Sequence, residues 1–157
     1  MTNGKTYNFL EFYHSDPVVV VPENPSCTVT QSAISVNLED ANTSQLVMAG
    51  DTSKDKTFSI PLTCTSDVNI ALGFSGDIAD NTNAVFRNLS GSANASSVGV
   101  QILNGGTPVP TTAGNYLNLG VVNGSMSVPL IARYYALANN ADAGTVNAIA
   151  YASIVYN

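Results

Sequence analysis

Apolar and polar residues alternate along most of the chain after residue 27, which is the pattern of β-strands with one face in a core. In the segment 27–38, Ile34, Val36 and Leu38 fall on one face, and Ser35 and Asn37 fall on the other. The same alternation recurs in five later segments, 57–64, 67–76, 98–103, 124–137 and 145–156. Polar, turn-forming stretches separate these segments, so the pattern predicts an all-β antiparallel sandwich.

Turn signals support this interpretation. Asn104-Gly105-Gly106 and Val122-Asn123-Gly124 are typical of hairpin loops. The best helical candidate, ALANNADAG at 136–144, has no amphipathic repeat. We expect a loop there, with at most one helical turn.

The N-terminal part has a different character. Residues 6–13, TYNFLEFY, form a short aromatic-rich strand, and HSDP ends it. Two prolines in the segment 22–26 suit a linker or a sheet edge. We therefore predict that residues 1–16 are the end of a preceding domain or an N-terminal extension, that 17–26 are a linker, and that 27–157 form one domain.

The last predicted strand is strongly apolar and continues to the end of the sequence. One face carries Ala150, Ala152, Ile154 and Tyr156, whereas Ile149, Tyr151, Ser153 and Val155 occupy the other face. An apolar strand of this kind must be paired on both edges, or it accepts the backbone of another chain. The small residues would leave a shallow groove for large side chains from a partner.

Composition excludes several classes of partner. Charged residues make up 10% of the chain, the net charge is −6, and the five Lys and Arg residues are dispersed. Nucleic acids and anionic membranes attract clustered cations, so neither is expected as a partner. The sequence has neither an apolar run long enough to cross a membrane nor a basic, apolar leader at its start. We expect that a leader has been removed or that the chain is a piece of a longer protein.

Candidate catalytic chemistry is sparse. The only two cysteines, Cys27 and Cys64, predict one disulfide and an oxidising compartment, with two buried free thiols as the alternative. His14 is the only histidine, so no catalytic triad or four-ligand zinc site can be assembled. Asp77, Asp80 and Asn81 lack the spacing of a calcium loop and predict a turn. We expect no enzyme activity, no metal and no cofactor.

In several segments taken together, the chain from about residue 18 onward resembles the chaperone-usher pilins of Gram-negative bacteria. The resemblance rests on the early Cys27 with Cys64 at the end of PLTC, and on LGFSG followed by AVFRNLSG. It also rests on VGVQIL before NGGTPV, on PLIARYYA, and on a terminal signature of Gly144, alternating apolar residues and the penultimate Tyr156.

This resemblance implies an immunoglobulin-like sandwich that lacks its last strand and is closed by one disulfide. It implies a fimbrial subunit whose groove accepts a strand first from a periplasmic chaperone and then from an adjacent subunit, with an outer-membrane usher assembling the fibre on the cell surface. The residues expected at this groove are Ile34, Val36, Gly144, Ala150, Ala152, Ile154, Tyr156 and Asn157.

The N-terminal segment resembles the junction of two-domain tip adhesins of the type 1 fimbrial kind. In that case a host glycan would bind only through a lectin domain outside this sequence. Three alternatives remain: an adaptor pilin that donates residues 7–13 to a neighbour, a chain that completes its own sheet with 7–13, and a free-standing carbohydrate-binding sandwich.

Overall fold

The computed structural model describes residues 6–14, 27–30, 33–90 and 94–156, with residues 6–14 and 33 described by their backbone. Within these ranges the chain is almost entirely β-structure, with one 3₁₀ turn, η1 (Thr43–Gln45). No helix of the described residues is long and apolar enough to cross a membrane. The strands are β1 (Thr6–His14), β2 (Cys27–Val29), β3 (Ala33–Ala41), β4 (Thr52–Gly76), β5 (Ile78–Asp80), β6 (Val85–Arg87), β7 (Val98–Asn104), β8 (Thr107–Pro108), β9 (Leu117–Ala136) and β10 (Val146–Tyr156).

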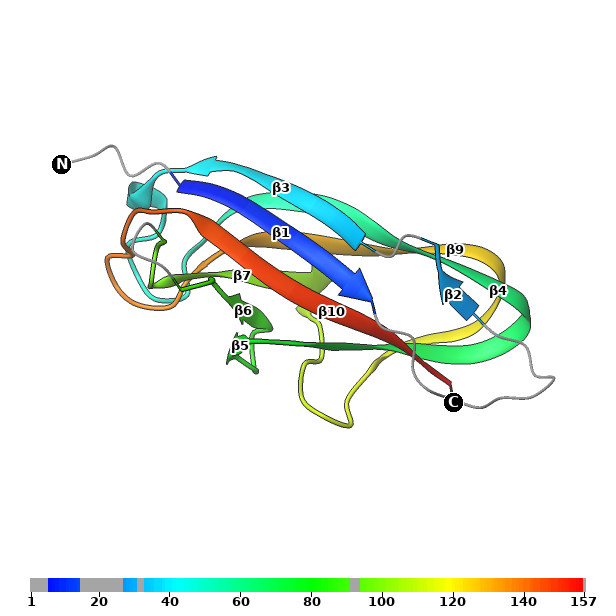
Figure 1. The fold of residues 1–157 in the computed structure, drawn as a ribbon. Coiled ribbons are helices and arrows are strands. Elements are labelled where there is room, and N and C mark those ends of the chain that lie inside the picture. Colours follow the sequence, from blue (N-terminus) through cyan, green and yellow to red (C-terminus); the bar gives the residue numbers. More distant parts are fainter. Residues whose placement is uncertain (1–5, 15–26, 31–32, 91–93, 157) are drawn as a thin grey trace.

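The strands form one curled sheet in the order β3-β1-β10-β4-β9-β7-β6-β5, with β2 paired to β4 and β8 paired to β7. Figure 1 shows β3, β1 and β10 lying side by side along the length of the molecule. The long strands β4 and β9 pair with each other over most of their length and connect the two ends of the fold. The predicted all-β class is confirmed.

The core lies between the layers of this curled sheet and takes alternate residues from each long strand. Residues with less than a tenth of their surface exposed follow the predicted period of two in β3, β4, β9 and β10. Tyr134 is the largest of the fully buried side chains, and its hydroxyl donates a hydrogen bond to the carbonyl of Glu39 at 2.9 Å. The phenol therefore meets the requirement that a buried polar group has a partner.

Two details of the predicted strand pattern are wrong. The expected strands 57–64 and 67–76 are parts of the single strand β4, which has a register shift against β9 between Cys64 and Val68. The expected hairpin at 122–124 lies inside β9, where Gly124 pairs with Cys64 at a φ of 76°. A glycine in this left-handed conformation accommodates an irregularity within a strand as readily as a hairpin turn, so the local signal did not distinguish them.

The other predicted turn and the predicted loop are confirmed. Gly105 and Gly106 have φ angles of 59° and 84°, and they connect β7 to β8 between the paired residues Asn104 and Thr107. Positive φ at both central residues is what a tight hairpin turn requires. Residues 137–144 contain no helix and form the loop between β9 and β10.

Candidate strand-docking site

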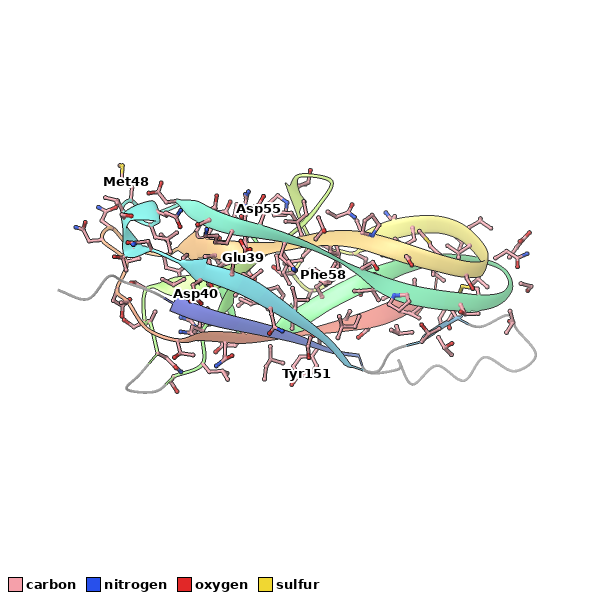
Figure 2. All side chains as sticks on the ribbon, turned by 90° about the horizontal axis from the view of Figure 1, so that it is seen from above. Glu39, Asp40, Met48, Asp55, Phe58 and Tyr151 are labelled. Atoms are coloured by element: carbon pink, nitrogen blue, oxygen red, sulfur yellow. A yellow bond between two sulfur atoms is a disulfide. The ribbon has the colours of Figure 1, made fainter. Side chains whose placement is uncertain are left out.

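The two faces of β10 differ sharply in exposure. Val146, Ala148, Ala150, Ala152 and Ile154 are each at most 2% exposed and belong to the core. The opposite face carries Asn147, Ile149, Ser153 and Val155 at intermediate exposure and Tyr151 at 41%. Figure 2 shows Tyr151 on the outer side of the sheet. The face with Ala150, Ala152 and Ile154, which the sequence nominates for the groove, is therefore the core face.

Between β3 and β10 lies a strip of the sheet that we call the β3–β10 gap. Among the described strands these two do not pair with each other, and β1 lies between them. β1 is parallel to β10 and antiparallel to β3, so its backbone is paired on both edges. The gap is therefore one strand wide.

The core side of the gap is lined by small residues on β10 and larger ones on β3. Ala148, Ala150 and Ala152 border it on one edge. On the other edge Val36 is 3% exposed, and Ile34 is partly buried against the same core. A strand in the gap therefore has more space for side chains above β10 than above β3.

The other edge of β10 is held in two different ways. From Ala150 to Tyr156 it pairs with β4 in an antiparallel ladder. Before Ala150 the buried side chain of Asn88 takes over: its amide nitrogen donates to the carbonyls of Ala95 at 2.7 Å and Thr145 at 2.8 Å, and its oxygen accepts from the N–H of Asn147 at 2.7 Å. The side chain of Asn88 therefore replaces a strand partner at the start of β10.

The loop that leads into β10 is fixed by a carboxylate. Asp142 accepts hydrogen bonds from the backbone N–H groups of Ser96 and Ser97, both at 2.9 Å, and from both serine hydroxyls. Partial desolvation raises the pKa of Asp142, but the hydrogen bonds from the two serines and from its own backbone outweigh this effect and lower the pKa to about 2. Gly144, a predicted groove residue, follows in the same loop with a φ of 152°.

The end of β10 is tied to the disulfide. Cys27 and Cys64 form the predicted bond between β2 and β4, so the alternative of two free thiols is wrong. The N–H of Cys27 donates to the hydroxyl of Tyr156 at 2.9 Å, and this hydroxyl donates to the Cys27 carbonyl at 3.2 Å. Tyr156 packs against the core, and Asn157 lies outside the described residues.

The structure thus brings most of the predicted groove residues to one strip of the sheet, from β3 on one edge and β10 on the other. Their role in binding a partner stays a prediction. Sequence reasoning missed Asn88 and Asp142, which position β10 without lining the gap. Asn88 lies in the short polar sequence NLS at 88–90, which carries no sign that its side chain is buried.

Elsewhere in the described residues, the predicted turn around Asp80 and the possible metal sites offer no catalytic or metal-binding arrangement. Asp80 accepts hydrogen bonds from Asn83 and from the N–H of Thr82, which forms the predicted turn. The side-chain hydrogen bond from Asn83 is the main reason that the pKa of Asp80 is lowered. Among the described side chains, no group of three His, Cys, Asp or Glu residues is arranged to hold a metal ion.

Comparisons with known proteins agree with this architecture. Residues 18–157 match the family model described as fimbrial protein. The chain is 31% identical to the type 1 fimbrin D-mannose specific adhesin of Escherichia coli (strain K12), over 98% of this chain and 47% of the adhesin. It is 26% identical to a fimbria adhesin protein of Klebsiella pneumoniae, over 92% of this chain and 48% of that protein. The chain spans about half the length of these curated relatives.

Solved structures show the same fold. The P pilus rod subunit PapA aligns with a TM-score of 0.68 at 17% identity, covering 83% of this chain and 99% of PapA. A subunit from the structure of a chaperone-usher pilus aligns with a TM-score of 0.62 at 19% identity, covering 90% of this chain and 91% of that one. With the family model matching most of the sequence, the chain belongs to the fimbrial protein family, whose members are structural and adhesive pilus subunits rather than enzymes.

Proposed function

We propose that this chain is the pilin part of a fimbrial tip adhesin, and that a strand donated by another protein completes its sheet in the β3–β10 gap. The observation that supports the proposal best is the β3–β10 gap, whose bordering strands do not pair with each other and are separated by the width of one strand, β1. In the proposed assembly a periplasmic chaperone fills the gap first. An adjacent pilin subunit then replaces it as an outer-membrane usher adds the chain to a fibre on the cell surface.

The chemistry of the gap suits strand addition. In this structure β1 pairs with both bordering strands, and an extended segment from another protein that took its place would make the same kind of backbone hydrogen bonds. The alanines of β10 leave room for large apolar side chains at every second position of that segment. Exchange of one such strand for another replaces hydrogen bonds and buried apolar area with equivalent ones, so the step needs no nucleotide.

The choice of a tip adhesin rests on the sequence similarity. Both curated relatives are named adhesins, and this chain covers about half of each. A host glycan would bind through a further domain. This agrees with the small number of side chains suited to ligand binding in the part described here. The main alternative is an adaptor pilin whose residues 7–13 are donated to a neighbouring subunit.

Photo-crosslinking from an exposed position next to the gap tests the proposal. A benzoylphenylalanine placed at Ser35, on the exposed face of β3, should crosslink to a pilus chaperone co-expressed in the periplasm. The same probe at Thr107, in the β7–β8 hairpin, is the matched control and should not crosslink. Both positions are exposed, so neither probe should disturb the core.

A complex that crosslinks from position 35 alone supports strand addition at the gap. Failure of the chaperone to co-purify with the chain, or crosslinking from position 107 alone, would overturn the proposal.

A further inference from the structure

We propose that Asn123-Gly124 is a site of spontaneous deamidation, and that the carboxylate of Asp67 assists the loss of ammonia from the Asn123 side chain. The product is an aspartyl or isoaspartyl residue at position 123. This inference concerns the chemical ageing of the domain, and it does not depend on the proposed function.

The reaction needs only the protein and water. The backbone nitrogen of Gly124 attacks the side-chain carbonyl carbon of Asn123, and the new C–N bond closes a cyclic succinimide. The amide nitrogen leaves as ammonia and takes with it the proton lost from the backbone N–H. Water then opens the ring at either carbonyl, without any oxidation or reduction. Glycine favours the attack, because it has no side chain to block its nitrogen and its backbone is the least restricted.

The described residues contain two Asn-Gly pairs, Asn104-Gly105 and Asn123-Gly124, and a third pair at residues 3–4 lies outside them. Both described glycines have positive φ angles, 59° and 76°. A Cβ atom placed on either glycine would meet no other atom within 4 Å, so both have open space around them. The glycines alone therefore do not distinguish the two sites.

The backbone of the two asparagines is held differently. Asn104 is paired with Thr107 across the β7–β8 hairpin. Among the described strand pairs Asn123 has no register partner, because the ladder between β4 and β9 shifts between Cys64 and Val68. An asparagine in such an irregularity can turn its side chain towards the next nitrogen after a smaller local opening than one held in a ladder.

The two side-chain amides also have different partners. The nitrogen of Asn123 donates a hydrogen bond to the carboxylate of Asp67, and the nitrogen of Asn104 donates to the neutral carbonyl of Pro129, both at 2.8 Å. This nitrogen is the leaving group, and it gains positive charge as it is protonated. A carboxylate at hydrogen-bonding distance stabilises that charge more than a neutral carbonyl does. Asn123 is also exposed to the water that opens the ring, whereas Asn104 is half-buried.

Deamidation would replace an attraction at this position by a repulsion. Two carboxylates would then face each other where Asn123 now donates to Asp67, and like charges repel. The change adds one negative charge to the net charge of −6. The isoaspartyl product also adds one backbone atom to β9 beside the register pair of Gly124 and Cys64. The part of the β4–β9 ladder next to the disulfide should therefore become less stable.

Chymotryptic peptide mapping of the full, oxidised chain tests the inference, after incubation at neutral pH in water labelled with heavy oxygen. Each conversion introduces one labelled oxygen, so the mass increase separates conversion during the incubation from earlier conversion. We expect Asn123 to convert at least about fivefold faster than Asn104, because less local opening is needed. Residues 3–4 lie in a separate peptide and do not enter the comparison.

Two matched variants test the role of the carboxylate. Asp67→Asn keeps a hydrogen-bond acceptor and removes the charge, so it should slow the conversion of Asn123 at least about threefold and leave Asn104 unchanged. Asp55→Asn removes a carboxylate elsewhere in β4, where it lies 3.7 Å from Arg133, and it should leave both rates unchanged.

Equal rates at the two asparagines, or faster conversion of Asn104, would overturn the assignment of the site. An unchanged rate at Asn123 in Asp67→Asn would overturn the role of the carboxylate. In concentrated urea the two asparagines should convert at similar rates, because the fold no longer distinguishes them. A difference that persisted in urea would come from the neighbouring sequence, and the structural explanation would be wrong.

Discussion

Asn88 is the single side chain on which the position of β10 depends most directly. It is 7% exposed and has three hydrogen-bonding partners on Ala95, Thr145 and Asn147. Because these partners are backbone groups in a buried or half-buried setting, removal of the amide leaves them unsatisfied, and each such group costs about 1–3 kcal/mol. Asn88 therefore acts as a substitute for a neighbouring strand.

The variant Asn88→Ala should lower the free energy of unfolding by about 3 kcal/mol, since several buried polar groups lose their partner at once. Urea denaturation of the oxidised chain measures this loss. The control Asn123→Ala removes an asparagine that is exposed and bonded to Asp67, and it should change stability by less than about 0.5 kcal/mol. Similar losses for the two variants would contradict the role assigned to Asn88.

Asp142 makes stability depend on pH at the acidic end. Its pKa is about 2 in the folded chain against an ordinary value of 3.8, so the folded state binds this proton less readily than the unfolded state. Stability from the ionised carboxylate is fully present above pH 4 and is lost as the pH falls towards 2. Asp142→Asn should remove this component, which urea denaturation between pH 6 and pH 2 would detect as a difference from wild type that shrinks with acidification. A difference that stays constant over this range would argue against the carboxylate.

At the residue level, the sequence predicted which side chains would be buried better than which polar groups would matter. Alternation alone placed Ala150, Ala152 and Ile154 on one face, and they are buried together. Asn88 was indistinguishable from a surface residue, because its three partners come from segments up to 59 residues away in the chain.

At the level of the elements, the disulfide joins the short strand β2 to the middle of β4. It closes a loop with a sequence separation of 37 residues. Restricting an unfolded loop of this length corresponds to about 4 kcal/mol on the chain-entropy model. Because β2 has only three residues, the bond contributes much of what holds it against β4.

The double variant Cys27→Ala/Cys64→Ala should therefore lose about 2–4 kcal/mol of stability in urea denaturation. The control Thr28→Ala/Thr63→Ala changes the next register pair of the same ladder and should lose less than about 1 kcal/mol. If the cysteine variant loses no more than the threonine variant, the disulfide does not stabilise this connection as we expect.

The elements also show where local sequence signals fail. The polar stretch after Cys64 looks like a turn, yet β4 continues through it because β9 runs alongside on both sides of the irregularity. Strand length in this fold is set by the partner strand, and a partner distant in sequence leaves no local signal. The turn predicted at residues 122–124 is wrong for the same reason, since this segment lies inside β9 and Gly124 pairs with Cys64.

For the whole molecule, the arrangement of its two ends is the main finding. A strand from the start of the chain lies beside the last one, and the penultimate Tyr156 bonds to Cys27. Such pairings close large loops of the chain. Contacts between distant segments form slowly during folding, and they cost conformational entropy.

The sequence by itself determined the all-β class, the disulfide pair, the division of β10 into two faces and the family, because these depend on side-chain period, residue type and ordered short motifs. The tertiary structure alone decided that β1 occupies the gap, that β4 and β9 are continuous, and that Asn88 supports β10. The physical reason is that each of these features depends on hydrogen bonds between segments far apart in the chain. Every residue has much the same backbone N–H and C=O groups, so the local sequence does not show which distant segment these groups will bond to.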